Sequence, residues 1–264
     1  MNNIINSIYN IGFLDELSKK DTFINRIHPI IKVIITLLYL VFVLSFGRYE
    51  ISKLITFVFY PILIFSLAEI PVVPILKRVV IALPFILGIG IVNLFFDKEI
   101  IMVGGLAIRS GYITFTSIFI KCLLTVTASI LLIATTGMER LGLALRMMKI
   151  PKIFVLQLLL TYRYISLFME EVSTMSRAYA LRAPNENGIG FKAWGSFAGQ
   201  LLLRTYDKAT RIYESMTLRG FNGEYNTGDI EKLKYKDYMY MILWSLFFIV
   251  SKFIDIPNII GNLF

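Results

Sequence analysis

Residues 112–135 read YITFTSIFIKCLLTVTASILLIAT and contain a single formally charged side chain, Lys121. A helix that spans a bilayer needs about 20 predominantly apolar residues, and this run is long enough. Four further apolar runs of comparable length occur along the chain, at residues 31–46, 51–67, 79–96 and 238–254. The sequence therefore predicts about five transmembrane helices.

The composition of the 264-residue chain agrees with this prediction. Hydrophobic residues make up 56% and charged residues 17% of the sequence, and the mean hydropathy is +0.70. Soluble domains have about 45–50% apolar and about 25% charged residues, so both a soluble domain and a disordered chain are excluded. The single Cys and single His exclude an internal disulfide framework and a zinc site built from those residue types. We expect an all-α polytopic membrane protein.

The distribution of basic residues predicts the orientation of these helices. More than half of the 27 Lys and Arg residues lie in the segment 136–237, between the fourth and fifth spans. A cytoplasmic N-terminus leaves four basic residues in the external loops, namely Arg48, Lys53, Lys98 and Arg109. Lys and Arg are biased toward the cytoplasm, so a cytoplasmic N-terminus and a cytoplasmic segment 136–237 are favoured, and the net charge of +9 indicates basic loops rather than nucleic-acid binding.

The chain accordingly divides into a membrane bundle at 1–135, a cytoplasmic helical region at 136–237 and a last transmembrane helix within 238–264. In the cytoplasmic region, the pattern predicts a short helix over 137–149 that ends before a proline. A helix over 151–183 follows, and a third runs from 191 to Gly220, with apolar residues spaced by threes and fours. Two long amphipathic helices joined by a short turn are typical of a docking platform for other proteins.

The two long helices end in similar sequences. Residues 180–183 read ALRA and residues 217–220 read TLRG, which places Arg182 and Arg219 at equivalent positions. A cation near a helix C-terminus offsets the macrodipole by about 0.3–1 kcal/mol, which explains both arginines without a partner. Alternatively, the small residue that follows each arginine lets its planar guanidinium project into a partner and bind a carboxylate at two points. The residues alone leave both interpretations open.

Several stretches make the sequence resemble a known family: NRIHPIIK at 25–32, ATT at 134–136, LTYRYI at 160–165 and the two arginine-containing helix ends. Together they resemble the transmembrane (T) component of energy-coupling-factor (ECF) transporters, most closely the cobalt-type CbiQ family. In that family two cytoplasmic coupling helices each end in an Ala-Arg-Gly-like triplet, which docks in a groove of one ATPase subunit. The corresponding triplets here are Leu181-Arg182-Ala183 and Leu218-Arg219-Gly220; both depart from the pattern at the first residue, and the first departs also at the third.

The resemblance implies a subunit that is not itself an enzyme and has no catalytic or metal-binding residues. Two ABC-type ATPase subunits would bind ATP and Mg²⁺, and their closure would be transmitted to a separate substrate-binding membrane protein. The expected cargo is a cobalt or nickel ion, and the expected location is a bacterial plasma membrane. The sequence is compatible with this division of labour, because it contains no GxxxxGK[ST] loop and no HExxH pair.

Three alternatives remain open from the sequence. The chain could be a shared T component for several vitamin-binding partners. It could be an intramembrane enzyme, although the predicted spans offer only Lys121, Cys122 and scattered hydroxyl groups for chemistry. It could also be a self-sufficient secondary transporter, but five spans with one large insert do not divide into repeated halves. We expect Lys121 to snorkel or to face a neighbouring helix, and His28 to have a capping or packing role rather than a metal-binding one.

Overall fold

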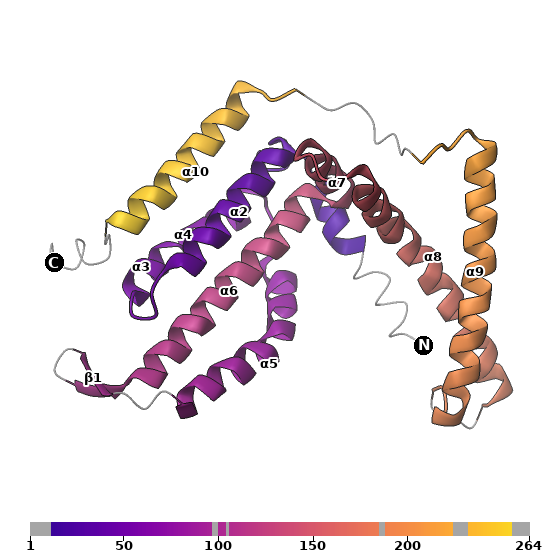
Figure 1. The fold of residues 1–264 in the computed structure, drawn as a ribbon, viewed down its shortest axis with the longest axis horizontal. Helices are drawn as coiled ribbons and strands as arrows, with labels where there is room; N and C mark the ends of the chain where they lie inside the picture. Colours follow the sequence, from indigo (N-terminus) through magenta and orange to yellow (C-terminus); the bar gives the residue numbers. More distant parts are fainter. Residues whose placement is uncertain (1–11, 97–99, 104–105, 185–187, 224–231, 255–264) are drawn as a thin grey trace. The chain divides into compact units, whose positions relative to one another are not determined.

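The computed structural model describes residues 12–96, 100–103, 106–184, 188–223 and 232–254 (Figure 1). The chain forms two compact units. One, the bundle unit, comprises Leu17–Gly137 and Glu231–Phe264; the other, the arm unit, comprises Met1–Glu16 and Met138–Ile230. The chain therefore passes from one unit to the other three times.

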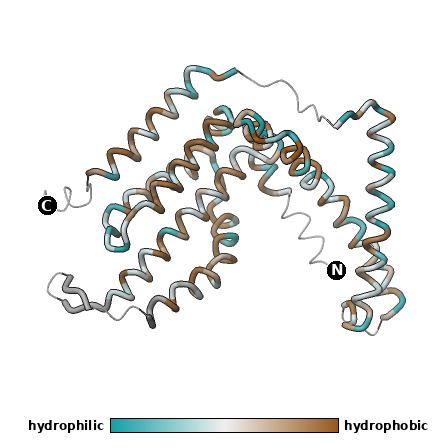
Figure 2. Tube along the Cα trace, in the orientation of Figure 1, coloured by the Kyte–Doolittle hydropathy of each residue, from teal (hydrophilic) through white to brown (hydrophobic). Residues whose placement is uncertain are grey.

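Every run that the sequence predicts as a span is helical in the bundle unit, which confirms the all-α class. The helices are α2 (Pro29–Ser45), α3 (Ile51–Thr56), α4 (Phe59–Leu67), α5 (Val72–Phe96), α6 (Ser110–Thr136) and α10 (Tyr235–Phe253). Apolar residues predominate along α2, α4 and α6 (Figure 2). Residues 255–264 of the predicted last segment lie outside the described residues.

Three of the described helices are long and apolar enough to cross a membrane by themselves. They are α5, over Val72–Val92, α6, and the helix Lys152–Arg182 of the arm unit; Pro29–Ser45 and the 51–67 region are apolar but shorter. Length and composition therefore support a membrane protein with several spans.

The second predicted span is divided at Phe57 into α3 and α4. Pro61 has no N–H group and cannot bond the carbonyl of Phe57 four residues earlier, so the helical ladder is interrupted there. The hydroxyl of Tyr39 on α2 donates to this free carbonyl at 3.1 Å. A proline break inside a membrane helix is tolerated when a neighbouring helix supplies such a replacement bond.

Two boundaries differ from the expected ones. Helix α5 begins at Val72, seven residues before the predicted start at 79. Pro74 lies in its first turn, where the missing N–H group costs little. Between α5 and α6 the predicted loop contains a short antiparallel hairpin, in which β1 (Ile100–Val103) pairs with β2 (Leu106–Arg109) and Ile100 is opposite Arg109.

The core of the bundle unit is aromatic and centres on Phe248 of α10, which has 0% of its surface exposed. Its ring lies 5.6 Å from the ring centroids of Tyr39 and Tyr60 and 5.7 Å from those of Phe57 and Trp244. These partners belong to α2, α4, α10 and the break between α3 and α4. One side chain of α10 thus packs against α2, α4 and the break between α3 and α4.

The arm unit is built from α7 (Met138–Met147), α8 (Lys152–Arg182), the 3-10 turn η1 (Phe191–Ala193) and α9 (Trp194–Leu218). Helix α7 is shorter than predicted, because Gly137 and Lys149 on either side of it have positive φ angles of 73° and 63°. The Asp15 carboxylate accepts the backbone N–H of Met138 at 3.0 Å. A side chain from the start of the chain therefore caps the N-terminus of α7.

Candidate functional site

Helices α8 and α9 form a V-shaped helical hairpin (Figure 1). The two helices are joined across the hairpin by Glu171 of α8, which forms ion pairs with Arg204 at 3.1 Å and Lys208 at 3.7 Å. Near the turn, the backbone N–H of Gly190 donates to the hydroxyl of Tyr179 at 3.4 Å. Apolar and polar residues alternate along α9, as expected for an amphipathic helix (Figure 2).

The space between the two helices is lined by apolar side chains. A cavity of about 300 Å³ opens there, and residues from both helices contribute to it, among them Leu160, Tyr164, Phe168, Ile212, Tyr213 and Met216. Arg219 is one of the residues that line a second, more polar groove of the hairpin, together with Glu171, Arg204 and Arg211. The polar groove thus extends to Arg219, at the end of α9.

The first predicted triplet lies at the C-terminus of α8. The helix ends at Arg182, and Ala183 caps it by donating its N–H to the carbonyl of Tyr179 at 3.0 Å. Arg182 is exposed, and Leu181 beside it has 84% of its surface exposed. A Leu-Arg pair thus projects from the end of the helix into solvent.

The second triplet lies at the C-terminus of α9 in a Schellman motif. Gly220 has a φ angle of +83°, its N–H bonds the carbonyl of Thr217 at 2.9 Å, and the N–H of Phe221 bonds the carbonyl of Met216 at 3.0 Å. The predicted stop at Gly220 is thereby confirmed. Leu218 is 89% exposed and Arg219 is exposed as well.

The two helix ends, which we call the tips, share a pattern that the macrodipole alone does not explain. A cation at a helix C-terminus accounts for Arg182 and Arg219. It does not account for the almost fully exposed leucine that precedes each of them. Among the described residues, neither guanidinium has an ion-pair or hydrogen-bond partner. An apolar side chain beside an available arginine is the composition that interface hot spots favour, because the first supplies packing and the second supplies bidentate hydrogen bonds.

The geometry of the second tip leads to a prediction about two glycines. Gly220→Ala is expected to lower the free energy of unfolding by about 1 kcal/mol, because an alanine is strained at this positive φ angle. Gly199→Ala, within α9 and with no atom within 4 Å of the added methyl group, is expected to raise it by about 0.5–1 kcal/mol. Thermal unfolding in detergent, followed by circular dichroism, measures both changes. Shifts in the same direction would contradict the motif.

The structure also places the two other side chains that the sequence singled out. Lys121 of α6 donates its ammonium group to the carbonyl of Phe46, the residue that caps the C-terminus of α2. It therefore faces a neighbouring helix, as predicted. His28 is the N-cap of α2, and its Nδ1 accepts the N–H of Ile30 at 3.3 Å, which is the predicted capping role. The described residues contain no group of three or more His, Cys, Asp or Glu side chains that could hold a metal ion.

Comparison with known proteins identifies the family. A model of the CbiQ cobalt transport protein family matches residues 20–229. An uncharacterized protein of Methanocaldococcus jannaschii is 27% identical over 87% of this chain and 82% of its own length. The nickel permease LarQ of Lactiplantibacillus plantarum is 26% identical over 43% of both chains, and the cobalt transport protein CbiQ of Salmonella typhimurium is 22% identical over 55% of this chain and 70% of its own.

The family match covers most of the arm unit, both tips and most of the apolar helices of the bundle unit. These helices and the permease relatives indicate a multi-pass membrane protein with a role in transport. The chain belongs to the CbiQ cobalt transport protein family.

Proposed function

We propose that this protein is the transmembrane coupling subunit of an ATP-driven ECF importer. Two ABC-type ATPase subunits bind Arg182 and Arg219 with their neighbours Leu181, Ala183, Leu218 and Gly220. Their closure on ATP moves the arm unit, and the bundle unit passes this motion to a separate substrate-binding membrane protein. The observation that carries the proposal is the pair of equivalent, exposed Leu-Arg tips at the ends of one hairpin.

The spacing of the tips supports two separate partners. Arg182 ends α8 next to the turn, whereas Arg219 caps the far end of α9, which is 25 residues long. At 1.5 Å per residue, α9 is about 37 Å long, and the two tips lie near its opposite ends. This length exceeds the diameter of a small globular domain, about 30 Å, and so favours a separate partner at each tip.

The ion pairs of the hairpin support an aqueous location for the arm unit. Helix α8 is apolar enough to span a bilayer by composition. Its second half, however, carries Glu171 on the face toward α9, where Arg204 and Lys208 form ion pairs with it. Charged side chains within a bilayer are costly, so we place α8 and α9 at the cytoplasmic surface. The bias of Lys and Arg toward the cytoplasm then puts the N-terminus inside as well.

The transported substrate is assigned from the named relatives of this chain. The named relatives are a nickel permease and a cobalt transport protein, so we assign cobalt or nickel ions as substrate. ATP and Mg²⁺ are bound by the ATPase subunits, and the transported ion is recognised by the substrate-binding membrane protein. This chain supplies the mechanical connection between them.

The proposal is tested by producing this chain in the same cell as its ABC-type ATPase subunits and its substrate-binding membrane protein. The tagged chain is expected to retain the ATPase subunits in detergent, and the complex in vesicles is expected to take up Co²⁺ or Ni²⁺ only with ATP. Retention without uptake of either ion, together with co-purification of vitamin-binding proteins, would exclude metal ions as the cargo. An intact ATPase pair that does not bind the folded wild-type chain would refute the coupling function.

A further inference from the structure

The chain connects the two units at three places, and a buried polar side chain lies at each of them on the bundle side. The connections meet the bundle unit at Leu17, Gly137 and Glu231. The three side chains are Asn25, Lys32 and Asp237, which are 3%, 4% and 4% exposed. Buried polar groups of this kind are expensive unless their hydrogen bonds are satisfied, so their common position calls for an explanation.

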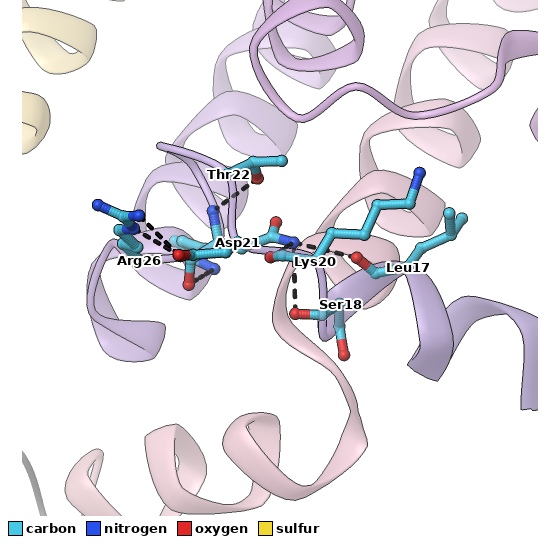
Figure 3. Close-up of polar contacts among 8 residues, drawn as sticks. Leu17, Ser18, Lys20, Asp21, Thr22 and Arg26 are labelled. Carbon is cyan, nitrogen blue, oxygen red and sulfur yellow. Dashed lines mark hydrogen bonds and ion pairs between the residues drawn. The ribbon is translucent and has the colours of Figure 1, made fainter.

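Asn25 holds the first connection. Its side-chain nitrogen lies 3.0 Å from the carbonyl oxygen of Leu17, 3.3 Å from that of Ser18 and 2.9 Å from that of Lys20. Figure 3 shows these three residues around one point, with the exposed ion pair of Arg26 and Asp21 to one side. The hydrogen bonds from Arg26 lower the pKa of the Asp21 carboxyl, but an exposed pair adds little stability. The buried amide is therefore the main anchor of this segment.

Lys32 holds the second connection. Its ammonium group donates to the carbonyl of Thr135 at 2.7 Å and to that of Asn25 at 3.3 Å. Thr135 lies in the last turn of α6, two residues before the chain leaves the bundle unit after Gly137. Carbonyl groups in the last turn of a helix lack intrahelical partners and carry the negative end of the dipole, so a buried cation is favourable there.

Asp237 holds the third connection. Its two carboxylate oxygens accept the backbone N–H of His28 at 2.9 Å and that of Lys234 at 2.8 Å. His28 is the N-cap of α2 and Lys234 is the N-cap of α10. One buried carboxylate therefore joins the positive ends of two helix dipoles, where negative charge is stabilised.

The three anchors are linked to one another. Lys32 donates to the carbonyl of Asn25, and His28 lies one helical turn before Lys32 on the same segment. The set therefore fastens the starts of α2 and α10, the end of α6 and the loop at 17–20 to one another. We call Asn25, Lys32 and Asp237 the polar clamp.

We propose that the polar clamp transmits motion from the three connections to α2, α6 and α10, so that the bundle unit moves when the arm unit moves. This inference rests on the proposed coupling function. The backbone–backbone hydrogen bonds of these segments on the bundle side are local in sequence. Without the clamp, each segment could therefore shift by itself and absorb the displacement. Discrete, well-packed contacts are what allow a small displacement at one site to move a whole element. Asn25, Lys32 and Asp237 are thus positioning residues for coupling.

Two matched substitutions separate this role from a general contribution to stability. Lys32→Met removes the ammonium group from the clamp, and its control is Lys121→Met, because Lys121 likewise donates to a backbone carbonyl but at the opposite end of α2. Asp237→Asn replaces one of the two accepting oxygens by an NH₂ group, which is itself a donor and cannot accept a backbone N–H. Its control is Glu50→Gln, because the Glu50 carboxylate also accepts a backbone N–H, from Gly47 at 3.0 Å.

The first measurement is hydrogen exchange of the full-length chain in detergent. In Lys32→Met and Asp237→Asn, the amides of residues 17–20, 133–137 and 234–238 are expected to exchange at least about tenfold faster than in the wild type. The two controls are expected to leave these amides unchanged. Unchanged exchange in both clamp variants would show that the clamp does not hold the connections, whether or not the ATPase subunits bind.

The second measurement uses the assembled transporter in vesicles and compares Co²⁺ or Ni²⁺ uptake per ATP hydrolysed. Both clamp variants are expected to retain the ATPase subunits and to hydrolyse ATP, while uptake per ATP falls at least about fivefold relative to Lys121→Met and Glu50→Gln. An equal fall in all four variants would overturn the clamp. A wild-type chain that does not bind the ATPase subunits would refute the coupling function, and the exchange result would then decide whether the clamp exists.

Discussion

Reversing both tip charges, with Arg182→Glu and Arg219→Glu, is expected to abolish stable binding of the ATPase subunits while the chain stays folded. Both side chains are exposed, and among the described residues they have no partner whose loss would disturb the fold. Truncating an arginine hot spot commonly costs at least about 2 kcal/mol of binding free energy, and a glutamate adds repulsion against a partner carboxylate. We therefore expect a loss of affinity of more than about 30-fold at each tip, measured by retention on the tagged chain in detergent.

The matched control is the double variant Arg177→Glu with Arg211→Glu. These arginines are exposed on the same two helices, five residues before Arg182 and eight before Arg219, and their reversal changes the net charge by the same amount. Size-exclusion chromatography checks that both double variants are folded. Equal losses in the two double variants would mean that net charge, not the tips, governs binding. Wild-type retention by the folded tip variant would exclude the tips as the docking site.

The single reversals refine this result. If each tip binds one ATPase subunit, either single variant should still retain one subunit, with about half the ATPase protein bound per chain. A complete loss in both single variants would indicate that the two subunits bind only as a pair. The ratio of ATPase protein to this chain in the purified sample distinguishes the two cases.

Replacing Phe248 by alanine is expected to lower the free energy of unfolding of the bundle unit by about 3 kcal/mol. Phe→Ala substitutions in packed cores cost about 3–5 kcal/mol. Membrane proteins depend on such packing, because moving an apolar side chain from lipid into the protein interior gains little free energy. Phe248 is fully buried and its ring contacts those of Tyr39, Phe57 and Tyr60. Unfolding in a denaturing detergent titration, followed by tryptophan fluorescence of Trp244 beside it, measures the change.

Phe253→Ala on the same helix provides the control, since Phe253 is 79% exposed. It is expected to change the free energy of unfolding by less than about 0.5 kcal/mol. A Phe248 variant as stable as the Phe253 variant would mean that α10 does not pack against α2 and α4 in this way.

Local sequence patterns predicted the helices well. The apolar runs and the proline and glycine signals placed α6 and α9 within a few residues of their observed ends. They placed α8 more closely still, at Lys152–Arg182 against the predicted 151–183. Helix ends depend on properties of neighbouring residues, such as the missing N–H of a proline or the positive φ angle of Gly220, so they can be recognised without the fold.

The docking residues could also be predicted from the sequence, but the exposure of the leucines beside them could not be predicted. The resemblance to the family pointed to Arg182 and Arg219, while the macrodipole explained them equally well. The structure added that Leu181 and Leu218 are almost entirely exposed beside them. Whether a leucine at a helix end is covered depends on what packs over it, which periodicity does not specify.

The polar clamp was invisible in the sequence for the same reason. Residues 25–32 stood out as a stretch shared with the family, yet nothing local assigned a partner to Lys32. Its partner Thr135 is 103 positions away, and the partner of the His28 N–H is 209 positions away. By itself, then, the sequence determined which segments are helical, that several are suited to a membrane, and where two helices present an arginine. Only the tertiary structure decided that the Tyr39 hydroxyl bonds the Phe57 carbonyl at the helix break, and that three buried side chains hold the connections between the units. The reason is that these contacts depend on how the helices pack, which local sequence patterns do not specify.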